Sequence, residues 1–96
     1  MVDGIKFASK AEAKRYGALK MLARANEIEE LELQPKFSID INGIHICNYS
    51  ADFRYVDCRE GVQVIEDVKG VKTTVYKLKK RLVEALYGVK ITEVAA

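Results

Sequence analysis

The stretch VIEDVKG, residues 64–70, limits the possible folds most, because it places charges inside a segment that otherwise has the character of a buried strand. Its valine and isoleucine side chains are typical of a strand in a protein core, whereas Glu66, Asp67 and Lys69 are charged. Burying a charge costs roughly several kcal/mol unless the charge is paired or binds a metal. We therefore expect either that one edge of this strand is exposed to water or that its charges have a function.

The size and composition of the chain predict one globular domain over residues 1–96. The apolar fraction of 49% and the charged fraction of 31% are ordinary for such a domain. No apolar run of about 18 residues is present, so we expect no membrane span. The first residues lack the apolar core of a secretory signal, so we expect a cytoplasmic protein. Cys47 and Cys58 have no metal-binding spacing and are expected to be reduced thiols.

Hydrophobic periodicity and turn residues predict the order of the elements. Ser9 and Glu12 have the spacing of a capping box at the start of a helix, and Asn42-Gly43 is typical of a hairpin turn. The predicted elements are a helix over residues 10–25, strands over 33–41, 44–56 and 62–68, a helix from Thr73 or Thr74 to Tyr87, and a strand over 90–94. This αβββαβ order implies an α/β (α+β) domain in which helices flank a mixed sheet.

Apolar positions within each element predict which face points to the core. In the first helix these positions are Tyr16, Leu19 and Ala23. In the second helix they are Val75, Leu78, Leu82 and Leu86. In the strand over residues 44–56 they are Tyr49, Ala51, Phe53 and Tyr55. Asp52 lies on the opposite, polar face of that strand.

Two carboxylates and one ammonium group are predicted to meet at one edge of the sheet. Asp67 and Lys69 share a face, because side chains two residues apart on a strand point the same way. If their strand pairs with that of Asp52 across the turn at 57–62, the three groups converge, and Mg²⁺ binds through one or two such carboxylates. Glu12 lies within roughly 40° of the apolar stripe of its helix at about 100° per residue, so it is a candidate to join this site.

Asp52, followed after fourteen residues by Asp67-Val68-Lys69 in an αβββαβ order, resembles the PD-(D/E)XK nuclease superfamily. The resemblance covers residues 9–94. The segments FASKAEAKRY, LELQPKF, YSADFRYVD and EDVKG are similar to small endonuclease-like proteins encoded by phages and prophages. The resemblance implies a restriction-endonuclease-like core and a protein that acts in the cytoplasm of a bacterial host cell.

The resemblance also implies a role for each site residue. Asp52 and Asp67 would bind Mg²⁺, for which Mn²⁺ is expected to substitute, and Glu12 would complete the metal site. Lys69 would orient or activate the attacking water. The backbone carbonyl of Val68 would add a further ligand.

The sequence departs from the superfamily pattern at one position and leaves two assignments open. Ala51 stands where the name of the motif has proline, a residue that brings no chemistry of its own there. Glu66 is a second acid beside Asp67: the parity of the strand favours Asp67, whereas a β-bulge would favour Glu66. Gln34, in the LQP segment, is either a polar residue of an edge strand or a residue that lines the site.

Basic and hydroxyl side chains that follow the predicted site indicate the substrate, because such groups bind the phosphates of nucleic acids. The candidate DNA-binding residues are Lys72, Thr73, Thr74, Lys77, Lys80 and Arg81. We therefore predict a Mg²⁺-dependent endodeoxyribonuclease that is structure-directed or weakly sequence-specific, for example a resolvase of junction or branched DNA. A homodimer is expected because cleavage of both strands needs two active sites. The alternatives are a non-catalytic DNA-binding module on the same fold and a small interaction protein with neither activity.

Overall fold

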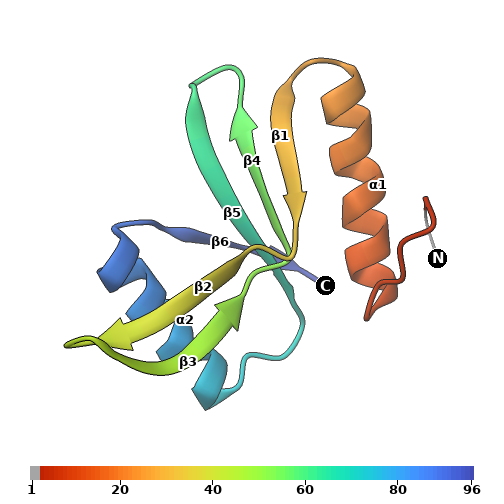
Figure 1. Ribbon diagram of the computed structural model, residues 1–96. Helices are drawn as coiled ribbons and strands as arrows, with labels where there is room; N and C mark the ends of the chain where they lie inside the picture. Colours follow the sequence, from red (N-terminus) through yellow and green to blue (C-terminus); the bar gives the residue numbers. More distant parts are fainter. Residues whose placement is uncertain (1–2) are drawn as a thin grey trace.

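The computed structural model describes residues 3–96, which form two helices and six strands (Figure 1). The elements are α1 (Lys10–Arg24), β1 (Ile28–Leu33), β2 (Lys36–Ile41), β3 (Ile44–Ser50), β4 (Phe53–Asp57), β5 (Val62–Lys69), α2 (Thr74–Tyr87) and β6 (Ile91–Ala95). The predicted α+β class is confirmed. Within the described residues, neither helix is long and apolar enough to cross a membrane.

The strands form two separate sheets. The larger sheet has the order β1-β4-β5-β6, in which β6 runs parallel to β5 and the other neighbours are antiparallel. The hairpin β2–β3 is a two-stranded antiparallel sheet of its own. Figure 1 shows α1 alongside the larger sheet, and α2 packed behind the hairpin. The mixed sheet that the sequence predicts is therefore present, but the hairpin does not belong to it.

Two of the predicted strands are interrupted, and one strand was not predicted. The segment over residues 33–41 breaks at Gln34, and the segment over residues 44–56 breaks at Asp52. The two breaks lie side by side, and we call this place the crossing point. There the N–H of Gln34 donates to the carbonyl of Asp52 at 2.9 Å, and the N–H of Ala51 donates to the carbonyl of Pro35 at 3.1 Å. At the crossing point both segments of the chain pass from one sheet to the other. The acidic segment before Gln34 forms β1, so five strands precede α2 instead of three.

The crossing point divides the apolar residues between two cores. The predicted alternation in burial is correct, because Tyr49, Ala51, Phe53 and Tyr55 are all buried. Tyr49 and Ala51 pack in a core beneath α2, however, whereas Phe53 and Tyr55 pack in a core beneath α1. A sequence pattern of period two reports burial but does not report which core a residue enters.

Capping residues define both helices as the sequence predicts. The hydroxyl of Ser9 accepts a hydrogen bond from the N–H of Glu12 at 3.1 Å, and Thr73 does the same for Tyr76 at 3.1 Å. Gly88 ends α2 in the left-handed conformation with φ +65°. Both helix starts therefore have one of their free N–H groups satisfied by a side chain.

Of the four residues predicted for the core face of α2, only Leu82 packs against the core of this helix. Its buried residues are Tyr76 and Val83, whereas Val75 and Leu78 are 62% and 58% exposed. Leu86 is also exposed. The helix has more apolar positions than the narrow hairpin can cover, and Tyr76 and Val83, seven residues apart, form the covered stripe. By contrast, the predicted core residues of α1 are correct, since Tyr16 and Leu19 are buried.

Candidate functional site

Asp52 lies at the crossing point, directly before β4 and next to the end of β5. The register of the two strands pairs Phe53 with Glu66, so the pairing across the 57–62 turn is present. Continued by one residue, this register places Asp52 opposite Asp67. The N–H of Asp52 donates to the carbonyl of Glu66 at 3.0 Å, and its Oδ2 accepts from the N–H of Val68 at 2.7 Å. The Asp52 backbone and carboxylate are thus fixed against β5.

Asp67 is a fully buried carboxylate without a hydrogen-bond donor. Its exposure is 0%, and neither Oδ1 nor Oδ2 accepts a hydrogen bond from any residue that the structure describes. Its pKa is raised from 3.8 to about 6: burial is the main cause, the charge of Lys69 acts in the opposite direction, and the charges of Glu12 and Glu93 add to the rise. A buried polar atom without a partner is rare in folded proteins, which makes Asp67 a candidate for a functional role.

Lys69 provides the positive charge nearest to this carboxylate. Its Nζ lies 4.0 Å from Oδ1 of Asp67 and 4.9 Å from the centre of the Tyr76 ring. Aromatic rings attract cations through their electron-rich faces. The ammonium group is therefore located by the carboxylate of β5 and by the first turn of α2 together.

Glu12 approaches the site from the first turn of α1. Its carboxylate is half-buried, and burial is the main cause that raises its pKa. The charge of Asp52 also raises this pKa, and that of Lys69 lowers it. Glu12 in turn raises the pKa of Asp67, so it lies near the predicted site although it comes from a distant part of the sequence.

Carboxylate oxygens are ligands that suit Mg²⁺ or Mn²⁺, which bind one or two carboxylates and retain several waters. The unpartnered oxygens of Asp67 fit such an ion, and the second oxygen of Asp52 is not used by Val68. Within residues 3–96, no group of three or more Asp, Glu, His or Cys side chains is arranged to hold a metal. That the carboxylates of Asp52 and Asp67 hold such an ion stays a prediction. A contribution from Glu12 or the Val68 carbonyl stays a prediction.

Glu66 faces away from Asp67, although the two residues are adjacent. Its carboxylate accepts hydrogen bonds from Nε of Arg15 at 2.8 Å and from Nη2 at 2.7 Å, and it also accepts one from the hydroxyl of Tyr55. Arg15 belongs to α1, so Glu66 joins this helix to the sheet. The structure places Glu66 outside the group formed around Asp67.

Gln34 lies beside Asp52 through the backbone bond at the crossing point. It is exposed and has a φ of +51°, a left-handed conformation that is strained for residues other than glycine. Residues in strained conformations concentrate at functional sites. A role of Gln34 in lining the site stays a prediction.

The predicted DNA-binding residues gather around the start and one side of α2. Four of them line a hollow of about 410 Å³ together with one acid, and these lining residues are Lys72, Lys77, Lys80, Arg81 and Glu93. The hydroxyl of Thr73 is used to cap α2, and Thr74 is its exposed first residue. Glu93 pairs with Asp67 in the parallel register of β5 and β6. The basic hollow therefore borders the buried carboxylate.

Glu93, Tyr76 and Arg15 were not among the residues that the sequence predicts for the site. Each depends on a contact between distant segments: Glu93 on the register of β6, Tyr76 on the rotation of α2, and Arg15 on the docking of α1. Arg15 lies three residues after Glu12, so it shares a helix face with it. That spacing was the one signal in the sequence that could have indicated its contact with the sheet.

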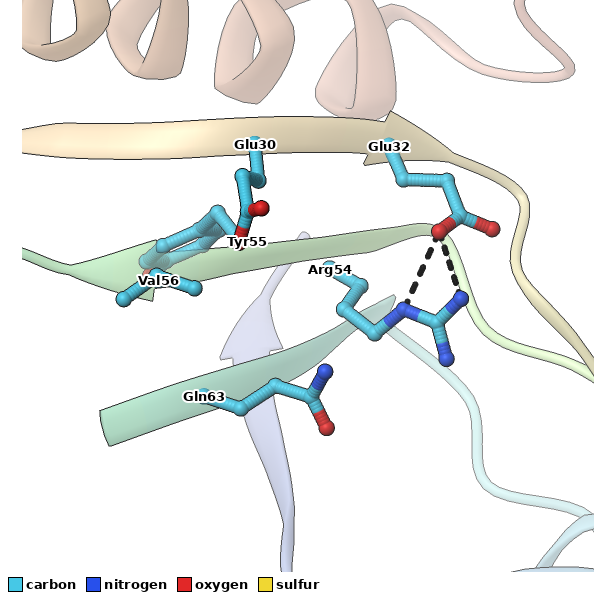
Figure 2. A pocket seen from close by; sticks show the side chains of 6 residues that line it. All are labelled: Glu30, Glu32, Arg54, Tyr55, Val56 and Gln63. Atoms are coloured by element: carbon cyan, nitrogen blue, oxygen red, sulfur yellow. Dashed lines mark hydrogen bonds and ion pairs between the residues drawn. The ribbon is translucent and has the colours of Figure 1, made fainter. Parts of the chain in front are cut away.

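A second polar hollow, of about 370 Å³, lies over β1, β4 and β5, and neither Asp52 nor Asp67 lines it (Figure 2). Its lining residues are Glu30, Glu32, Arg54, Tyr55, Val56 and Gln63. Figure 2 shows the guanidinium of Arg54 bonded to Glu32, and this group also lies 5.6 Å from the centre of the Phe37 ring. The arginine of this hollow is therefore already paired, and we place no function there.

The fold and the site together define a small α+β protein in which acids and a lysine meet where two sheets join. The chain belongs to the family described as "Protein of unknown function (DUF1064)", whose model matches residues 1–95. No curated protein and no solved structure matches the chain.

Proposed function

We propose that this protein is a Mg²⁺-dependent nuclease that hydrolyses phosphodiester bonds of DNA, as its resemblance to the PD-(D/E)XK superfamily implies. The observation that carries the proposal is Asp67, a buried carboxylate with two unpartnered oxygens beside Lys69. A protein retains such a costly group when a ligand compensates it. A divalent cation compensates a carboxylate charge directly.

The carboxylates of Asp52 and Asp67 would hold Mg²⁺, or Mn²⁺ in its place, and Glu12 would add negative charge nearby. The bound ion would polarise a phosphoryl oxygen and lower the pKa of a bound water. Asp52 is preorganised for this role, because Val68 fixes its carboxylate by a hydrogen bond of 2.7 Å.

Lys69 is the residue that would orient the attacking water and stabilise negative charge as it develops on the phosphate. Its ammonium is kept at the site by Asp67 at 4.0 Å and by the Tyr76 ring at 4.9 Å. A donor that is already in place does not need to reorganise during the reaction, which is the basis of electrostatic catalysis.

The basic hollow supports DNA as the substrate, because lysine and arginine contacts to phosphates position the backbone without reading the bases. Cleavage would therefore be structure-directed or weakly sequence-specific, as on junction or branched DNA. Action in the cytoplasm of a bacterial host, by a phage- or prophage-encoded protein, belongs to the same proposal.

A homodimer is also part of the proposal, because cleavage of both strands of a duplex needs two active sites. The exposed apolar residues Val75, Leu78 and Leu86 of α2 support it. They lie at helical spacing and form a surface patch of the kind that marks protein interfaces.

The second candidate function is a DNA-binding module without catalysis. It is favoured by the finding that residues 3–96 contain no group of three or more acidic, histidine or cysteine side chains arranged for a metal. In such a protein the basic hollow would bind DNA, and Asp67 would serve structure alone.

Calorimetric titration with Mn²⁺ separates the two functions. We expect the wild type to bind Mn²⁺ and Asp67→Asn to lose most of that binding, while Glu60→Gln, a charge change of the same size on an exposed turn, leaves it intact. A panel of single-stranded, duplex, flap and four-way DNA with Mg²⁺ then tests cleavage. Absence of Mn²⁺ binding in the wild type, or equal binding by Asp67→Asn, would refute the nuclease proposal.

A further inference from the structure

Glu93 is an acid at the centre of a basic surface. It shares the hollow of about 410 Å³ with three lysines and Arg81. Oε1 lies 3.1 Å from Nζ of Lys72, and Oε2 accepts a hydrogen bond of 2.9 Å from the hydroxyl of Tyr76. The carboxylate thus occupies the place where the cations of the hollow could hold an anion.

The surroundings of Glu93 keep its carboxylate ionised. The hydrogen bond from Tyr76 lowers its pKa most, followed by the bond from Lys72, and the positive charge of Lys80 adds to the effect. Lys80 itself lies 3.7 Å from Glu84 on the same helix. The ionised Glu93 therefore neutralises Lys72, whose ammonium would otherwise be free to bind a ligand.

The hollow borders the group around Asp67. Glu93 on β6 is the register partner of Asp67 on β5. Tyr76, which bonds Glu93 through its hydroxyl, holds Lys69 against the face of its ring. An anion bound in place of the Glu93 carboxylate would lie one strand away from the buried carboxylate.

We propose that the Glu93 carboxylate occupies a subsite for a backbone phosphate, and that a nucleic-acid strand displaces it to bind Lys72 and Tyr76. Phosphate oxygens accept the same charge-assisted hydrogen bonds from an ammonium and a hydroxyl as a carboxylate does. The Glu93 side chain is 27% exposed, so it has access to solvent when displaced. This inference rests on the DNA-binding part of the proposed function and does not depend on metal binding or cleavage.

Glu93 accordingly weakens the binding of DNA by competing with phosphate. Removing its charge frees Lys72 for one more phosphate contact. Each additional phosphate contact releases about one counterion, so the dependence of affinity on salt becomes steeper. Both quantities are measurable without any catalytic activity.

The test is fluorescence anisotropy with a labelled DNA duplex in EDTA, between about 50 and 200 mM salt. We expect Glu93→Gln to bind roughly three- to tenfold more tightly than the wild type, with a log–log salt slope steeper by about one. The glutamine can still accept the hydrogen bond from the Tyr76 hydroxyl, so we expect the fold to be kept. Thermal unfolding of the variant checks this. Glu32→Gln is the matched control, because it removes one charge beside Arg54, outside the hollow.

A second variant tests whether the increase in DNA affinity depends on Lys72. Lys72→Ala combined with Glu93→Gln should bind no more tightly than Lys72→Ala alone. The proposal is overturned if Glu32→Gln gives the same gain as Glu93→Gln, or if the gain survives without Lys72. An equal gain for a polyglutamate peptide would also overturn it, since the subsite would then select carboxylates rather than phosphates. Failure of Mn²⁺ binding or of cleavage would refute the nuclease function and leave these binding results unchanged.

Discussion

Glu66 and Asp67 are neighbours on β5 and are both buried, but only Glu66 accepts hydrogen bonds from a cationic side chain, whereas Lys69 lies 4.0 Å from Asp67. Glu66 is 1% exposed and bonds Arg15 through both oxygens, whereas Asp67 is 0% exposed and accepts no hydrogen bond within the described part of the chain. The two carboxylates point to opposite faces of the strand. Glu66 therefore joins α1 to the sheet, whereas Asp67 is the residue to which we assign the proposed metal site.

Arg15→Ala should destabilise the protein strongly. It leaves the Glu66 carboxylate buried with Tyr55 as its remaining partner, and breaking a buried ion pair costs about 3 kcal/mol. Chemical denaturation measures the loss. The double variant Arg15→Met with Glu66→Leu should recover much of the stability, because no buried charge is then left without a partner. If Arg15→Ala alone were neutral, the pair would not be what joins α1 to the sheet.

Asp67→Asn should stabilise the protein at neutral pH and much less in acid. The pKa of Asp67 is raised from 3.8 to about 6, so the native state binds this proton more tightly than the unfolded state does. The resulting stability is present below the ordinary pKa and is lost as the pH rises to about 6. The variant avoids this loss of about 1–3 kcal/mol. Denaturation at about pH 4 and about pH 7 measures it, and an equal difference at both pH values would contradict it.

The sequence was sufficient to predict those features of the fold whose signals are local. The Ser9 and Thr73 caps and the Asn42-Gly43 turn each depend on a few adjacent residues. The alternation on β5 correctly separated Glu66 from the face of Asp67 and Lys69. These features follow from backbone geometry alone.

Other features depend on contacts between distant segments, which a single sequence does not contain. The β1 segment is rich in glutamate, and it forms a strand because β4 supplies its partner. The break at Gln34 depends on the backbone bonds that this residue and Pro35 make to the crossing strand. The prediction of which face of α2 is buried was wrong because the helix has two apolar stripes. Tertiary packing buries the stripe that contains Tyr76 and Val83.

Leu78→Glu should turn a dimer into a monomer. Leu78 is 58% exposed in the apolar face of α2, and a charge buried at an interface has a high desolvation cost. Sedimentation velocity should report a dimer for the wild type and a monomer for the variant. Met21→Glu is the matched control, since Met21 is 71% exposed on α1, away from this face. A monomeric wild type at high concentration would refute the dimer.

Gln34→Gly should stabilise the fold and impair cleavage. Glycine adopts the φ of +51° without strain, and relief of this strain outweighs its larger entropy loss by roughly 0.5–1 kcal/mol. If the amide lines the site, the variant should cut DNA about tenfold more slowly, and Gln34→Asn should restore part of the rate. Asn42→Gly, at φ +53° in a hairpin turn, is the control for strain alone. A variant that is no more stable than the wild type would show that Gln34 is not strained.

Lys69→Ala should abolish cleavage while leaving the fold and the DNA affinity nearly intact. The Lys69 side chain is 30% exposed and its ammonium lies beside Asp67 and the Tyr76 ring, so its loss removes no core packing. The loss of one group that orients the water and stabilises charge should lower the rate by at least about 100-fold. Lys69→Met, which keeps the apolar part of the side chain over the Tyr76 ring, should be equally inactive, and Lys90→Ala on the surface should be fully active. A cleavage assay with Mg²⁺ measures activity, anisotropy measures DNA affinity, and thermal unfolding measures the stability of the fold. Because this lysine provides the positive charge paired with the buried carboxylate, undiminished cleavage by Lys69→Ala would remove its catalytic role, and a loss of DNA affinity as large as the loss of cleavage would assign it to binding instead.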